Sequence, residues 1–210
     1  LRSRPAEAIV DEARALIATG ARELNLVAQD VTAYGKDRRD GSSLASLLRA
    51  LDALEGDFWI RWLYGFHNHV TDDLLAAMAG ARHVVPYFDL PIQHSAPDIL
   101  RAMRRADTVK AIADFPARLR AAVPGATLRT TCMVGFPGEK KKHFDNLIDF
   151  VKEVRFDRMG AFTFYAEEGT PAECMAGQVS EATKKKRLDM LMRVQEEISF
   201  ERQQSFVGRE

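Results

Sequence analysis

Apolar residues follow two spacings along this chain, and segments with one spacing alternate with segments of the other. Short, nearly continuous apolar runs are typical of buried strands, and an apolar residue at every third or fourth position is typical of an amphipathic helix. Strands are predicted at residues 23–28, 58–64, 83–90, 127–134 and 158–165. Helices are predicted at residues 5–18, 44–54, 71–78, 97–103, 108–122, 140–154 and from 180 onward. The alternation predicts an α/β fold with a parallel sheet and right-handed crossovers, and it leaves open a doubly wound sheet or a (β/α) barrel.

Two prolines interrupt this pattern. Pro86 lies inside the third predicted strand, although proline has no amide hydrogen and belongs at strand starts, edges and bulges. Pro116 lies inside the predicted helix 108–122, and it should break or kink that helix near Phe115.

Composition limits the class of protein. The chain has 210 residues, of which 46% are hydrophobic, which is enough for one sizeable core and favours a single domain. Its 30 basic and 30 acidic residues balance, so nucleic acid and anionic membranes are not expected as main partners. No apolar run approaches the length of a membrane span. The two cysteines, Cys132 and Cys174, form no disulfide framework, so a reducing cytoplasm is the simplest setting.

The carboxyl ends of the predicted strands carry polar and irregular sequences. Ligands meet this end of the strands in both candidate architectures. The five ends read AQDVTAYG, YGFHNH, DLPIQH, GFPGE and YAEEGT. Ordinary turn chemistry explains any one of them, but five such ends together favour one convergent site.

The fourth end lies within TTCMVGFPGEKKK, where bare glycines follow a buried strand. Glycines there let another molecule approach the backbone, whose amides can bind an adenine edge, a phosphate or a carboxylate. The segment is neither a Walker loop nor GxGxxG, and its lysines 140–142 are interpreted as solvated surface. His67 and His69 have no third metal ligand by spacing and are interpreted as a surface loop, and Cys132 as a small buried hydrophobe.

Four longer motifs resemble the radical S-adenosylmethionine methylthiotransferases. They read LVAQDVTAYGKD, YFDLPIQHSAPDILRAMRR, RTTCMVGFPGE and YAEEGTPA, and the resemblance runs over nearly the whole chain. The resemblance implies a partial (β/α) barrel of radical-SAM type, similar to a TIM barrel. It also implies that S-adenosylmethionine lies across the strand ends. The cofactor-binding residues that it implies are Gln29, Asp30, Asp89, Gln93, His94, Gly135, Phe136, Gly138, Glu139 and Tyr165. Arg61 and Arg129 are strand residues that could point a guanidinium at a carboxylate.

The family branch that the motifs resemble modifies an aspartate of a small-subunit ribosomal protein. The resemblance therefore implies a cytoplasmic enzyme that methylthiolates the aspartate β-carbon, with S-adenosylmethionine, four-iron–four-sulfur clusters and an electron donor. The related tRNA-modifying branch is an alternative. Two further alternatives are a cluster-free barrel that binds a nucleotide or anion as a lyase or isomerase, and a non-catalytic docking module. In the cluster-free barrel, Glu139, Glu168 and His94 would be the acid/base set.

The sequence departs from the family pattern in one important respect. Radical enzymes of this family hold a cluster on a CxxxCxxC loop, and no such motif occurs here, so no metal ligand and no catalytic residue is assigned. We therefore expect residues 1–210 to be a fragment of the central radical-SAM domain that is inactive alone. The first barrel strand, the cluster loop, the N-terminal sulfur-donating domain and the C-terminal β-barrel domain would be missing. Smaller departures are His67 in place of a family proline, and the lysines 140–142.

Overall fold

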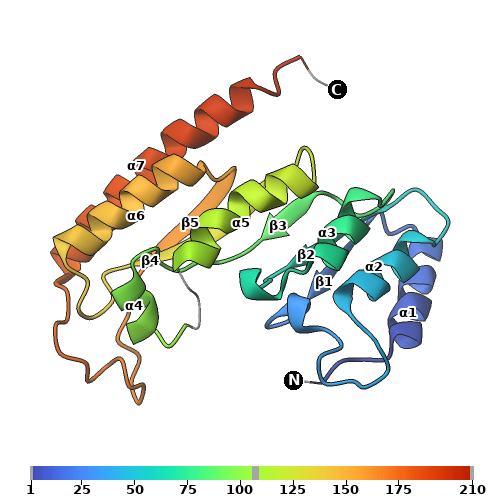
Figure 1. Ribbon diagram of the computed structural model, residues 1–210, viewed down its shortest axis with the longest axis horizontal. Coiled ribbons are helices and arrows are strands. Elements are labelled where there is room, and N and C mark those ends of the chain that lie inside the picture. The colour runs from blue at the N-terminus through green and yellow to red at the C-terminus, as the bar shows by residue number, and fades with distance from the viewer. Residues whose placement is uncertain (1, 106–108, 209–210) are drawn as a thin grey trace. The chain divides into compact units, whose positions relative to one another are not determined.

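The computed structural model describes residues 2–105 and 109–208 (Figure 1). The chain divides into two compact units. The N-terminal unit comprises Leu1–Leu90 and Ala117–Thr127, and the C-terminal unit comprises Pro91–Pro116 and Leu128–Glu210.

The N-terminal unit contains a parallel pair of strands with helices between them. In chain order its elements are α1 (Ala6–Ala18), β1 (Glu23–Val27), α2 (Leu44–Asp52), β2 (Trp59–Leu63), α3 (Asp72–Ala79) and β3 (Tyr87–Asp89). Short 3-10 helices, η1 (Val31–Ala33) and η2 (His67–His69), follow the first two strands. In the ladder Glu23 lies opposite Trp59, and Val27 lies opposite Leu63.

Side-chain caps fix where two of these helices begin. The Ser43 hydroxyl accepts the Ser46 amide at the start of α2, and the Thr71 hydroxyl accepts the Leu74 amide at the start of α3. The helix α2 packs on both α1 and α3, and its Leu51 is completely buried. Each cap thus places the apolar side of its helix toward the core.

The C-terminal unit has the same alternation. Its elements are α4 (Pro97–Ala102), β4 (Thr127–Val134), α6 (Lys141–Val154), β5 (Arg158–Thr163) and α7 (Glu181–Gln204), and the helix α5 (Val109–Ala122) divides between the two units. The strands β4 and β5 are parallel, with Arg129 opposite Arg158 and Val134 opposite Thr163. Figure 1 shows α6 and α7 side by side, and α7 also packs on β5.

One face of the strands is buried in each unit, and the other is open. Along β4, Leu128, Thr130, Cys132 and Val134 are buried, whereas the residues between them are half-exposed. Along β2, Ile60 and Trp62 are buried, and Trp59 is 48% exposed. A doubly wound sheet carries helices on both faces, so one covered face favours a strand layer of barrel type.

The structure confirms the predicted order of elements and corrects two details. The third strand is only Tyr87–Asp89, because Pro86 lacks the amide for a longer ladder, and Val84 forms only an isolated bridge to Ile60. The helix α5 is continuous through Pro116, so the expectation of a break near Phe115 was wrong, whereas the expectation of a kink there stays a prediction. Phe115 and Leu119 are both buried beside the proline, and this burial offsets the hydrogen bond that Pro116 cannot make. Thr108, the predicted first residue, lies outside the described residues.

Candidate functional site: the strand ends of the two units

The end of β1 carries a paired carboxylate. Asp30 Oδ2 lies 2.7 Å from His69 Nδ1, and Asp30 Oδ1 accepts the Thr32 hydroxyl. The Thr32 oxygen in turn accepts the Phe66 amide at 2.9 Å. This network ties the end of β1 to the segment after β2, while Gln29 stays exposed.

The histidines after β2 do not form a surface loop. His67 is only 4% exposed, so its interpretation as a surface residue was wrong, and His69 is partly buried against Asp30. His67 occurs in η2, and its ring lies 5.0 Å from that of Phe66. The neighbouring Phe66 ring and the short helical turn account for the burial of His67.

Asp89 is completely buried at the end of β3. Its Oδ2 accepts the Tyr64 amide at 3.2 Å, and its backbone carbonyl accepts the Gly65 amide at 2.9 Å. Tyr64 has a φ of 61°, which is unusual for a residue with a side chain. The buried carboxylate therefore holds the turn after β2 in a strained shape.

A charge pair lies on the open face of β1 and β2. Arg61 Nε donates to Glu23 Oε1 at 2.8 Å, and the guanidinium lies 4.6 Å from the centre of the Tyr87 ring. Hydrogen bonds from Trp59 and then Arg61 hold the pKa of Glu23 below its usual value. Arg61 is thus already paired with a carboxylate of this chain, and Arg129 is half-exposed on the open face of β4.

The glycine turn after β4 satisfies its amides within the chain. The Gly135 amide donates to Glu139 Oε2 at 2.7 Å, and the Gly138 amide donates to the Gly177 carbonyl at 2.9 Å. The Glu139 amide donates to the Phe136 carbonyl at 2.9 Å. A ligand at this turn would therefore meet its outer surface and carbonyls rather than these three donors.

A contact within the chain explains why position 135 is a glycine. A Cβ on Gly135 would lie 2.4 Å from Cγ of Lys184, and the residue has a φ of 78°. The buried stem of Lys184 therefore occupies the space beside this glycine. Gly138 differs, because its φ is 83° but a Cβ there would meet nothing within 4 Å.

Glu139 is the centre of a buried polar cluster. The Glu139 side chain is completely buried, its Oε1 accepts Arg187 Nη1 at 2.8 Å, and its Oε2 lies 3.6 Å from His94 Nε2. His94 Nδ1 accepts the Ala96 amide at 2.9 Å, so a neutral His94 carries its proton on Nε2, which is the nitrogen facing Glu139.

Three further predicted cofactor residues differ in burial and in contacts; they are Gln93, Phe136 and Tyr165. Gln93 has a φ of 65° and pairs with β4 through its backbone, and its buried Oε1 has no hydrogen-bond donor within the described residues. Phe136 packs on Phe164 with ring centres 5.1 Å apart, whereas Tyr165 is 78% exposed. An unpaired buried amide oxygen can accept from a ligand's hydrogen-bond donor, and an exposed aromatic ring can stack on a flat ring.

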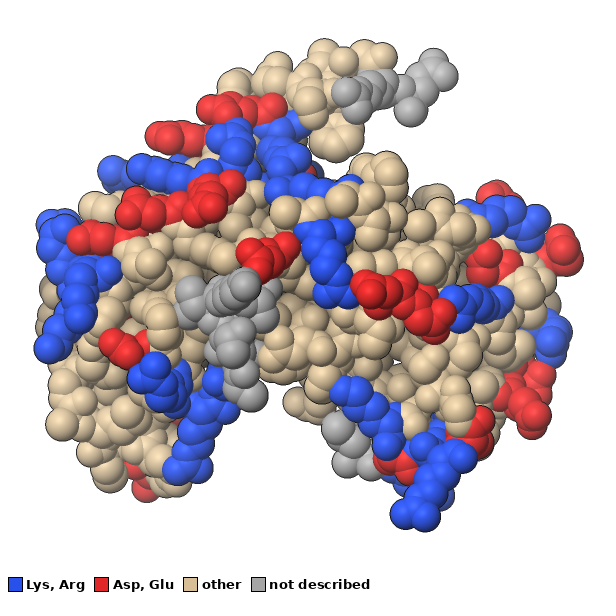
Figure 2. All heavy atoms as spheres, in the orientation of Figure 1, with Lys and Arg blue, Asp and Glu red and all other residues tan. Residues whose placement is uncertain are grey.

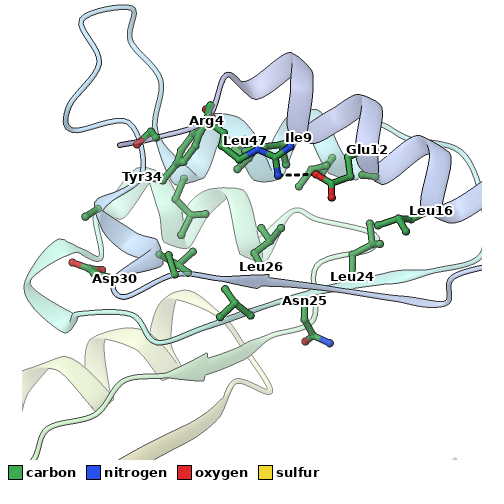
Figure 3. A pocket seen from close by; sticks show the side chains of 18 of the residues that line it. Arg4, Ile9, Glu12, Leu16, Leu24, Asn25, Leu26, Asp30, Tyr34 and Leu47 are labelled. Carbon is green, nitrogen blue, oxygen red and sulfur yellow. Dashed lines mark hydrogen bonds and ion pairs between the residues drawn. The ribbon is translucent and has the colours of Figure 1, made fainter. Parts of the chain in front are cut away.

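A pocket of about 550 Å³ lies between α1 and β1 in the N-terminal unit (Figure 3). Leu24 and Leu26 line it, and the ion pair between Arg4 and Glu12 lies beside it at 2.7 Å. Neighbouring residues of β1 on both of its faces line this pocket, and among the described strands β1 pairs only with β2. Asp30 is the one predicted cofactor residue that borders it.

The residues present do not fit an iron–sulfur cluster. Within residues 2–105 and 109–208, no group of three His, Cys, Asp or Glu side chains is placed to hold a metal ion. Burial raises the pKa of the Cys132 thiol to about 12, whereas a cluster ligand must be a thiolate, and Cys174 is exposed and alone. A cluster would need ligands other than these two cysteines.

The surface adds two observations. On the face seen in Figure 2, basic and acidic side chains are interspersed, as the balanced composition predicts. Lys141 and its neighbouring lysines are exposed, which confirms the interpretation of that run as solvated surface. No described helix is long and apolar enough to cross a bilayer.

Lys184 and Arg187 were missed by the sequence reasoning. Both belong to the run KKKR in the first turns of α7, which resembles an ordinary charged surface. Lys184 and Arg187 precede buried Leu191 by helical spacing, so they lie on the same, inward side of the helix. This spacing could have identified them from the sequence. His69 was interpreted as part of a surface loop, and its pairing with Asp30 joins residues far apart in sequence.

Comparisons with known proteins agree with this architecture. Residues 1–151 match the model of the Radical SAM superfamily. Ribosomal protein uS12 methylthiotransferase RimO of Geobacter sulfurreducens is 46% identical over 209 residues, which is all of this chain and 47% of that protein. The chain therefore spans about half the length of the curated relatives it matches.

Two solved structures share the fold. The coproporphyrinogen III oxidase HemN of Escherichia coli, described as a radical SAM enzyme, has a TM-score of 0.66 over 92% of this chain and 46% of its own, at 16% identity. The radical S-adenosylmethionine methyltransferase TsrM of Kitasatospora setae, with cobalamin and a [4Fe-4S] cluster bound, has a TM-score of 0.61 over 76% and 31%, at 15% identity. The parallel α/β fold is thus the partial-barrel type expected from the resemblance, and the chain belongs to the Radical SAM superfamily.

Proposed function

We propose that this chain is the radical-SAM core of an enzyme that methylthiolates the β-carbon of an aspartate in ribosomal protein uS12. The observation that supports the proposal is 46% identity, over the whole chain, to a uS12 methylthiotransferase. When bound, S-adenosylmethionine supplies the methyl group and, with one electron from an external donor through a reduced cluster, the radical chemistry that activates a C–H bond. In the net change a methylthio group replaces one hydrogen on carbon. The methyl group comes from one S-adenosylmethionine, the hydrogen leaves on the deoxyadenosyl group of a second, and the sulfur comes from the sulfur-donating domain that the resemblance implies outside residues 1–210.

In this proposal the C-terminal unit receives the adenosine part of S-adenosylmethionine. Gln93 offers a buried amide oxygen to the amino group of the adenine, and Tyr165 offers an exposed ring. The open space beside Gly138 leaves room for a flat base. His94 and Glu139 are buried next to one another. With Gly135 and Phe136, they stay predictions as cofactor residues. In the N-terminal unit, Gln29, Asp30 and Asp89 stay predictions as cofactor residues.

Cys132 and Cys174 are not proposed as ligands of a cluster, so neither cysteine is given a part in the reaction. Residues 1–210 alone are expected to produce no radical chemistry. The single-domain assignment and the cytoplasmic location likewise stay part of the proposal.

The test uses the full-length protein, purified without oxygen and supplied with S-adenosylmethionine, a reductant and purified uS12. Mass spectrometry of uS12 should show one added methylthio group on an aspartate. A parallel reaction contains tRNA instead of uS12. Modification of tRNA with unmodified uS12 would move the chain to the tRNA-modifying branch, and loss of both products would refute the proposal.

A further inference from the structure

The segment before α7 and the first turns of α7 contact the glycine turn after β4. The Gly138 amide donates to the Gly177 carbonyl at 2.9 Å, and a Cβ on Gly177 would lie 3.2 Å from the Gly138 nitrogen. Lys184 lies against Gly135. Arg187 Nη1 donates both to the Glu139 backbone carbonyl at 3.1 Å and to Glu139 Oε1 at 2.8 Å.

The contact between Arg187 and Glu139 is electrostatic and buried. The side chains of Glu139 and Arg187 are 0% and 12% exposed, so neither charge has much water to stabilise it. A buried carboxylate needs an opposite charge and hydrogen-bond donors, and Glu139 has Arg187 and the Gly135 amide. The carboxylate in turn keeps Gly135 in its left-handed conformation, because the Gly135 amide must point at Glu139.

The helix α7 has anchors other than Arg187. Leu191 is 0% exposed and Ile198 is 4% exposed, so both anchor the helix further along its length. Gln195 Nε2 also donates to the Phe156 carbonyl at 2.8 Å. Removal of the Arg187 charge therefore leaves the helix attached and disturbs mainly the turn that Glu139 closes.

We propose that Arg187 is a positioning residue for nucleotide binding. Through Glu139 it holds the turn Gly135–Glu139 in the shape that receives the adenosine of S-adenosylmethionine, although its own side chain never touches the ligand. This inference rests on the proposed function, in which the turn lies beside the adenosine. It assigns α7 a part in cofactor affinity that its exposed, charged sequence does not suggest.

The experiment measures equilibrium binding of S-adenosylmethionine to the full-length protein and five variants. Arg187→Met removes the charge and keeps much of the length, and Arg187→Lys keeps the charge with fewer donors. Glu139→Gln and Glu139→Gln/Arg187→Met together test whether the two residues act together. Lys186→Met, at an exposed position one residue away, is the control for loss of one positive charge from the helix.

Arg187→Met should weaken binding roughly tenfold, within the usual range of coupling between two sites, and Arg187→Lys should weaken it less. Lys186→Met should bind as the wild type does. The double variant should bind no more weakly than Glu139→Gln alone, because the arginine acts only through the carboxylate. Circular dichroism and thermal unfolding accompany each measurement.

Three outcomes separate the possibilities. If the wild type does not bind S-adenosylmethionine, the proposed function fails before the variants matter. If Arg187→Met binds as tightly as the wild type, whatever its thermal stability, Arg187 is only structural and the inference is overturned. If Arg187→Met does not fold, Arg187→Lys decides: weaker binding at an unchanged circular dichroism spectrum supports the inference, and unchanged affinity overturns it.

Discussion

Gly135→Ala should destabilise the protein strongly, because two separate penalties meet at this residue. Its φ of 78° is a conformation that costs a residue with a side chain about 1–2 kcal/mol. The new Cβ would lie 2.4 Å from Cγ and 3.1 Å from Cδ of Lys184, and overpacking of this kind costs about 1–3 kcal/mol. The free energy of unfolding should therefore fall by roughly 2–5 kcal/mol, a large part of the stability of a typical domain.

Gly125→Ala is the matched control for this prediction. Gly125 has nearly the same φ, 77°, but a Cβ there would meet nothing within 4 Å. This variant should therefore lose only the conformational part, about 1–2 kcal/mol. Urea unfolding of the two variants and the wild type measures the difference.

A second background isolates the contact with Lys184. In a protein that already carries Lys184→Ala, the Cγ and Cδ atoms are gone, so Gly135→Ala should cost about 1 kcal/mol less than it does in the wild type. Equal losses for Gly135→Ala and Gly125→Ala, with no relief from Lys184→Ala, would refute the argument that Lys184 keeps Gly135 bare.

Three further predictions concern the two cysteines, His143 and Gly138. Iodoacetamide should label exposed Cys174 in the folded protein but not Cys132, whose pKa burial raises to about 12, and mass spectrometry should find both labelled after denaturation. Burial holds the pKa of His143 below its usual value, and His143 Nδ1 accepts the Lys140 amide, so stability should be complete above about pH 6.5 and fall as pH drops below it. Replacement of His143 by Asn should flatten that profile in urea unfolding, and an unchanged profile would contradict the assignment. Gly138→Val should weaken binding of S-adenosylmethionine more than Gly138→Asn does, because asparagine tolerates the φ of 83° and valine adds branched bulk, and equal affinities would leave the turn with a structural role only.

The order of the elements could be predicted from the sequence because local patterns determine it. Strand β4 alternates buried and half-exposed residues over its whole length, and its predicted bounds match the structure. The start of α3 follows from Thr71, whose hydroxyl caps the helix. Such features depend on neighbours in sequence, so they can be read without knowledge of the fold.

The continuity of α5 could not be predicted in this way. Local propensity argues for a break at Pro116, because proline in a helix interior costs about 3 kcal/mol. Burial of Phe115 and Leu119 outweighs that cost, and burial depends on the tertiary structure. The same limit applies to Asp30 and His69, whose pairing depends on how two strand ends approach one another.

The two glycines of the turn show why a motif and its geometry carry different information. In the sequence Gly135 and Gly138 look equivalent, and one explanation, close approach of a ligand, covers both. The structure separates them, because Lys184 of α7 fills the space beside Gly135, whereas the space beside Gly138 is open. A residue constrained by its own chain and a residue with open space beside it thus occur in one motif. Glu139 joins Gly135 to Arg187, so under the proposed function the part of the turn that holds the fold also sets the shape of the part that would bind the ligand.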